Sequence, residues 1–100
     1  MKLLNYLNHM RQVIISLIRT VIQKKYGPLV YSVMSSNHFP TKNYPKGFGY
    51  IVTFLDIPKE NRVQISNDMR MLLQMLGLRN VQMVVSNDVI EVFGLEKQDI

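Results

Sequence analysis

Residues 50–77 read YIVTFLDIPKENRVQISNDMRMLLQMLG, and the hydrophobic period changes once within this stretch. Residues 50–55 are a run of β-branched and aromatic side chains, which predicts a strand. Pro58 then marks the start of a helix, because proline is tolerated at the first helical position, and Gly77 is the expected cap at its end. The apolar face of that helix comprises Ile65, Met69, Leu72, Leu73 and Leu76.

The segments on either side of this strand and helix add one helix and three strands. Residues 3–22 predict an amphipathic helix, and residues 29–34 predict a strand. Residues 81–85 and 89–93 predict a terminal hairpin, because the turn between them consists of residue types that accept positive φ. The order is α-β-β-α-β-β, and we expect an α+β fold, a four-stranded sheet with two helices packed on one face.

The first helix repeats apolar residues at alternating steps of four and three, which is the a/d pattern of a helix–helix seam. Gly27 and Pro28 predict its end, with Gly27 in the left-handed cap conformation. The 100 residues form one small domain: an amphipathic helix at 1–27, a ββαββ unit at 28–95 and a frayed tail at 96–100. The seam comprises Leu3, Leu7, Met10, Ile14, Leu17 and Val21.

Further apolar residues widen this seam beyond what one sheet face covers, so we expect the helix to form a homodimer or to bind a partner protein. Polar residues interrupt the helix too often for a transmembrane segment, and no uninterrupted apolar core precedes a cleavage site as in a secretory signal. A basic amphipathic helix is also compatible with an interfacial membrane anchor.

The charges are divided unequally along the chain. Residues 1–55 carry seven bases and no acid, a net charge of +7, whereas residues 56–100 carry five bases and seven acids, a net charge of −2. A field of one sign attracts polyanions or anionic lipid, so nucleic acid and membrane surfaces are the first partner classes to consider. The alternative is that the two halves fold against each other and their charges pair within the molecule.

The segment from Lys46 to Thr53 resembles the first ribonucleoprotein signature of RNA recognition motifs: a basic residue, glycine, an aromatic, a small residue, an aromatic and an aliphatic. Thr53 replaces the last aromatic of that pattern, and the chain begins with a helix where that family begins with a strand, so the family is not assigned. Phe48 and Tyr50 either stack on bases or pack in the core. We expect Tyr50 to be structural and Phe48 to be at least partly exposed.

Aromatic and basic residues alternate around the predicted loop at 35–48, as single-stranded nucleic acid binding requires. A nucleic-acid site built from this loop and the end of the first helix is predicted to include Arg19, Lys24, Lys25, Lys42, Tyr44, Lys46, Phe48 and Tyr50.

Signals for catalysis are weak. The two histidines, His9 and His38, have no companion at a useful spacing, and the acids form no metal-binding or paired-carboxylate pattern. The chain has no cysteine, which fits a reducing, cytoplasmic location. We therefore expect a non-enzymatic protein without cofactor or metal.

Three functions follow, in this order. The first is nucleic-acid binding by the basic N-terminal half. The second is a protein–protein interaction module, an inhibitor or adaptor, that dimerises through the first helix. The third is association with a membrane interface. An exposed patch at Met71 and Met75 would favour a protein partner, because methionine surfaces adapt to different ligands.

Overall fold

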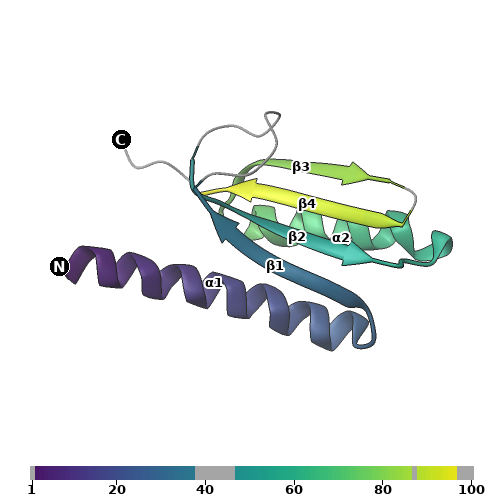
Figure 1. Ribbon diagram of the computed structural model, residues 1–100, viewed down its shortest axis with the longest axis horizontal. Coiled ribbons are helices and arrows are strands. Elements are labelled where there is room, and N and C mark those ends of the chain that lie inside the picture. The colour runs from purple at the N-terminus through teal and green to yellow at the C-terminus, as the bar shows by residue number, and fades with distance from the viewer. Residues whose placement is uncertain (1, 38–46, 87, 97–100) are drawn as a thin grey trace.

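A computed structural model describes residues 2–37, 47–86 and 88–96. It confirms the expected α+β fold: two helices lie on one side of a four-stranded antiparallel sheet (Figure 1). The elements in chain order are α1 (Lys2–Tyr26), β1 (Val30–Ser36), β2 (Gly49–Leu55), a short 3₁₀ turn (Lys59–Asn61), α2 (Arg62–Met75), β3 (Arg79–Val85) and β4 (Val89–Leu95).

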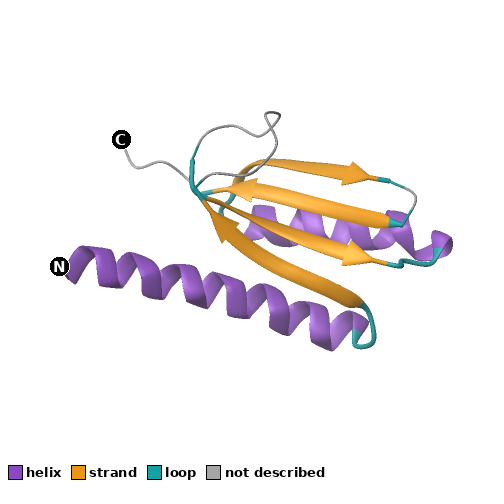
Figure 2. Cartoon of the chain, viewed as in Figure 1, coloured by secondary structure: helices purple, strands orange, loops and turns teal. Residues whose placement is uncertain are grey.

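The strands are arranged in the order β1-β2-β4-β3, so β1 and β3 are the two edges. β1 and β2 pair without interruption from Val30 opposite Leu55 to Ser36 opposite Gly49. The predicted hairpin forms between β3 and β4, and its register shifts between Arg79 and Gln82. Figure 2 shows α2 behind the sheet and α1 running alongside β1.

The core lies between the sheet and the two helices. Alternate residues of β2 and β4 point inward, as the period of two in a strand requires. The largest fully buried side chains of this core come from both helices and the two central strands: Ile18, Ile22, Tyr50, Phe54, Ile65, Met69, Leu73, Ile90, Val52 and Val92. A smaller cluster of Ile51, Phe93 and Leu95 is buried at the alternate positions of the same strands.

α2 begins at Arg62, after the 3₁₀ turn, and not at Pro58 as predicted. The C-terminal ends of both helices lie where the sequence predicts them, but not always with the predicted cap. Gly77 has a φ of 84°, the left-handed conformation expected of a glycine cap. α1 ends at Tyr26 as predicted, yet Gly27 is not among the residues with positive φ. Gly27 instead donates a backbone hydrogen bond to the Gln23 carbonyl, and Pro28 follows, which cannot continue the helix.

The buried face of α1 is not the predicted seam. Ile18 and Ile22 are buried, and Ile14 and Ile15 pack against them, whereas Leu17 is 46% exposed. A helix that lies along an edge strand contacts it over one narrow stripe, and here four isoleucines provide that stripe, of which only Ile14 belongs to the predicted seam. Most of the predicted seam therefore faces solvent.

The frayed tail was expected to begin at residue 96, but Glu96 is held by hydrogen bonds. The backbone nitrogen of Glu96 donates to the Phe48 carbonyl at 2.8 Å, and its side chain is also bonded. Residues 97–100 lie outside the described residues.

Candidate interaction site

Three of the predicted site residues, Lys42, Tyr44 and Lys46, lie outside the described residues, as does His38. The other five are distributed over the helix–sheet interface, the end of α1 and the solvent-exposed side of α1. They do not converge on one described surface.

Tyr50 is fully buried, so its ring offers no face to a base. Its hydroxyl donates a hydrogen bond of 2.8 Å to the Glu96 carboxylate. Burial, and then the hydrogen bond to this carboxylate, raise the pKa of the Tyr50 hydroxyl well above its ordinary value of 10.0. Tyr50 is thus structural, as expected, and its inclusion among the nucleic-acid-binding residues is corrected.

Phe48 is half-buried, which agrees with the expectation of partial exposure. The guanidinium of Arg11 lies 3.5 Å from its ring centroid, a cation–π contact that covers one face of the ring. Its edge contacts Tyr50 at a centroid distance of 5.8 Å. The glycine-flanked Phe48 therefore joins α1 to the sheet.

The same Arg11 holds Glu96 through two nitrogens, at 2.9 Å and 3.3 Å. Arg79 donates to the backbone carbonyl of Glu96 at 3.0 Å. Glu96 thus ties α1, β2 and β3 together at one end of the sheet. This network was not predictable from the sequence, because Arg11 and Glu96 are 85 positions apart and neither belongs to a motif.

Lys25 is also paired within the molecule. Its ammonium lies 2.9 Å from the Asp68 carboxylate of α2, which in addition accepts a hydrogen bond from the Tyr26 hydroxyl. The bond from Tyr26 and then that from Lys25 hold the pKa of Asp68 below its usual range. Burial and the hydrogen bond to Asp68 raise the pKa of Tyr26. This cluster joins the end of α1 to α2.

Arg19 and Lys24 remain exposed on α1. No hydrogen bond or ion pair joins either of them to another described residue. Among the described bases of the N-terminal half, Arg11 and Lys25 pair with acids of the C-terminal half, so the expected alternative of intramolecular pairing holds for these two residues.

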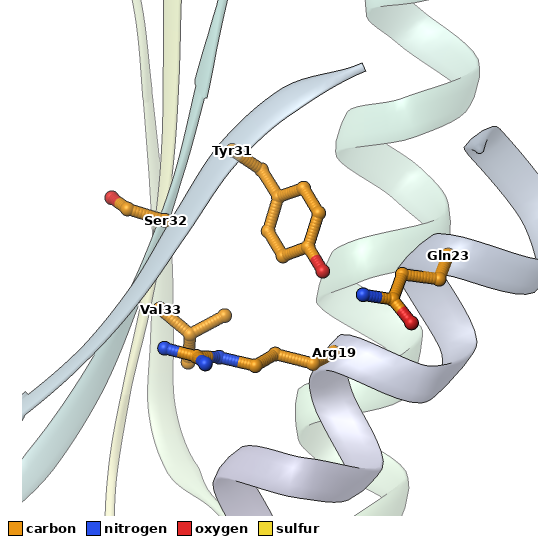
Figure 3. A pocket seen from close by; sticks show the side chains of 5 residues that line it. All are labelled: Arg19, Gln23, Tyr31, Ser32 and Val33. Atoms are coloured by element: carbon orange, nitrogen blue, oxygen red, sulfur yellow. The ribbon is translucent and has the colours of Figure 1, made fainter. Parts of the chain in front are cut away.

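Arg19 borders a hollow of about 370 Å³ between α1 and the edge of β1. Its lining comprises Arg19 and Gln23 of α1, one helical turn apart, and Tyr31, Ser32 and Val33 of β1. In Figure 3 the Tyr31 hydroxyl points toward the Gln23 amide, and Arg19 extends from the helix toward the strand. Ser32 points to the other side of the strand (Figure 3).

A second surface feature of α1 is a stripe of exposed apolar residues, here called the α1 stripe. Its members, with their exposed fractions, are Leu3 (78%), Tyr6 (62%), Leu7 (38%), Met10 (41%), Val13 (38%) and Leu17 (46%). At about 100° per residue these positions share the side of the helix next to the isoleucine face. On α2, Met71 and Met75 are likewise exposed, at 57% and 81%.

No group of histidine, aspartate or glutamate among the described residues is arranged to hold a metal ion. Within the same residues, neither helix has both the length and the hydropathy needed to cross a bilayer.

No protein-family model matches the chain, and comparison with curated proteins and with solved structures finds no similar protein.

Proposed function

We propose that this chain is a protein-interaction module that self-associates through the α1 stripe. The observation that carries the proposal is the exposure of six large apolar side chains on one side of α1, between Leu3 and Leu17. Contiguous apolar patches on soluble domains mark interaction surfaces, because their burial gains about 25 cal/mol per Å².

The N-terminal turns of α1 give a second argument. Leu3 and all described side chains from Asn5 to Met10 are exposed, and these turns extend past the end of β1 (Figure 1). A short helical segment in water gains most of its stability from packing. A partner on the stripe supplies packing that the chain itself does not supply there.

A second copy of the chain is the partner whose chemistry fits. Leu3, Met10 and Leu17 are seven residues apart, the repeat of paired helices. No charged side chain interrupts the stripe, and Arg19 lies on the opposite side of the helix. In an antiparallel pair the two Lys24 residues lie at opposite ends, so their repulsion is small.

The test is the molecular mass in solution, measured by sedimentation over a wide concentration range. We expect a concentration-dependent dimer, and we expect Leu17→Asp to give a folded monomer. Ser16→Asp adds the same charge on the polar side of α1 and is expected to leave the dimer intact. A wild-type protein that stays monomeric at every concentration contradicts the proposal, as does equal dissociation of the two variants.

A membrane interface is the competing occupant of the same stripe. Flotation with vesicles of anionic lipid tests it on the same proteins. If the wild type binds the vesicles, Leu17→Asp does not, and sedimentation detects no dimer, membrane association would replace self-association. Charge favours neither occupant, because the α1 stripe itself is neutral.

Nucleic-acid binding is a second candidate function, and unpaired Arg19 and Lys24 are the described residues that favour it. Lys42 and Lys46 belong to the same acid-free segment of the sequence, residues 1–55. The affinity for single-stranded DNA should then fall with salt, because each neutralised phosphate contributes a slope of about −0.7. Replacing Arg19 and Lys24 by glutamine should reduce that slope; an unchanged slope removes α1 from the site.

A further inference from the structure

β1 is an edge strand that lacks a charged residue, a proline and a bulge, three features that block strand addition. Its sequence, VYSVMSS, contains no charged residue and no proline, and its register with β2 runs through all seven residues without a bulge. Edge strands that must not pair with other chains usually carry such features. Between Val30 and Ser35, β1 is therefore a regular edge strand.

The other edge strand of the same sheet provides a contrast. β3 carries Arg79, has a register shift between Arg79 and Gln82, and holds Asn80 at a positive φ of 53°. A bulge of this kind twists an edge and interrupts pairing. One edge of the sheet is thus protected and the other is regular.

The hollow beside β1 places a positive charge, that of Arg19, next to this edge. Three consecutive residues of the strand, Tyr31 to Val33, line one wall, and Arg19 and Gln23 line the other. Its volume of about 370 Å³ is within the range of ligand sites, about 300–1,000 Å³. Arg19 has no acidic partner among the described residues, although its guanidinium is suited to a carboxylate.

We propose that this edge binds an extended peptide segment with an acidic side chain, which adds one strand to the sheet beside β1. Backbone hydrogen bonds to β1 supply affinity, as in other cases of strand addition, and Arg19 selects a carboxylate. Gln23 and the Tyr31 hydroxyl supply further polar contacts. The proposal is independent of self-association, because the α1 stripe lies on the other side of the helix from Arg19.

Charge argues against a second copy as the occupant of this edge. Two β1 strands paired edge to edge would bring two α1 helices together on the Arg19 side. Residues 1–55 contain no acid that would neutralise the two arginines. Like charges placed together lower affinity, so an acidic segment from another protein fits this edge better.

The experiment begins with short random peptides displayed on phage and selected on the full chain. We expect the selected sequences to alternate β-branched residues and to carry aspartate or glutamate at one register position. The binding of one selected peptide, labelled with fluorescein, is then measured by anisotropy. Arg19→Gln should weaken it about fivefold, and Lys24→Gln, the same charge change outside the hollow, should have little effect.

Backbone methylation of the peptide tests strand addition itself. Only alternate residues of an added strand bond to β1, so N-methylation should abolish binding at every second position and be tolerated between them. Leu17→Asp should bind the peptide as the wild type does, which separates this site from the α1 stripe.

Four results would overturn the proposal: no selected peptide, selection without an acidic position, equal losses in the two charge variants, or no period of two in the methylation series. Binding of a single-stranded oligonucleotide that depends on Arg19, with no peptide bound, would assign the edge to nucleic acid instead.

Discussion

Tyr50 illustrates how one side chain can serve packing and polar contacts together. Its ring fills the core and touches Phe48, while its hydroxyl reaches the Glu96 carboxylate that Arg11 also holds. The ring is fully buried, but the carboxylate is partly open to water, with 24% of its side chain exposed. The two functions of the residue are therefore separable by substitution.

We predict that Tyr50→Ala lowers the free energy of unfolding by about 3–5 kcal/mol, the loss expected when a buried aromatic ring leaves a cavity. Tyr50→Phe keeps the ring and removes only the bond to Glu96, so its cost should be about 1–3 kcal/mol. Urea denaturation of both variants measures the difference. Equal losses would show that the ring contributes nothing beyond its hydroxyl.

Gly94 lies at a position where there is little room for a side chain. It lies in β4 opposite Tyr50, and a Cβ built on it would lie 3.0 Å from the Leu78 Cβ and 3.1 Å from its Cδ1. Contacts this short force neighbouring atoms to move.

Gly94→Ala is accordingly expected to destabilise the fold by about 1–3 kcal/mol in thermal or urea denaturation. Gly27→Ala is the matched control, since the nearest atom to its Cβ is 3.8 Å away and its φ is not positive. The control should change stability by less than about 1 kcal/mol. A neutral Gly94→Ala would mean that Leu78 shifts without cost.

At the scale of elements, α1 shows what periodicity determines and what it leaves open. The spacing of apolar residues predicts the helix, Gly27 and Pro28 predict where it stops, and α1 does end at Tyr26. It does not determine which face is buried, because α1 is apolar over more than half of its circumference. The position of β1 decides in favour of Ile18 and Ile22 over the heptad residues.

This choice of face gives a prediction for two neighbouring residues. Ile18→Ala removes a fully buried side chain and should cost about 2–5 kcal/mol of unfolding free energy. Leu17→Ala truncates a side chain that is 46% exposed, so the monomer should lose less than about 1 kcal/mol. Denaturation at a concentration low enough to dissociate a dimer makes the comparison. The reverse order would place the heptad seam in the core after all.

The strands were predictable from local composition. Residues 50–55 and 89–93 are rich in β-branched and aromatic side chains, and they form the two central strands. The strands extend two residues further at Arg79 and Leu95, where polar residues and Gly94 weaken the pattern. The hollow at Arg19 was beyond prediction, because it depends on the distance between α1 and β1, which no local pattern encodes.

At the scale of the whole molecule, the division of charge is partly a folding device. Arg11 and Lys25 of the basic half bind Glu96 and Asp68 of the acidic half, one near the middle of α1 and one at its C-terminal end. Both pairs join residues more than 40 positions apart in sequence. They fix α1, which contacts the remainder of the domain mainly through four isoleucines, against the sheet and α2.

Asp68 makes this link dependent on pH. Hydrogen bonds from Tyr26 and Lys25 lower its pKa in the folded protein from the ordinary value of 3.8, so the unfolded chain binds a proton more readily than the folded one. The stabilisation is fully present above about pH 4 and is lost as the pH falls through the lowered pKa.

We predict that the urea midpoint of the wild type falls steeply as the pH is lowered below about 4, and that Asp68→Asn reduces this fall, because the amide does not titrate. Asp88→Asn serves as the control: Asp88 is 80% exposed on its side chain and lies 3.9 Å from Arg62, so this variant should follow the wild type. Midpoints measured from about pH 2 to about pH 7 make the comparison. If Asp68→Asn and the wild type lose stability in parallel, the acid sensitivity arises elsewhere, and the contact of α1 with α2 does not depend on this carboxylate.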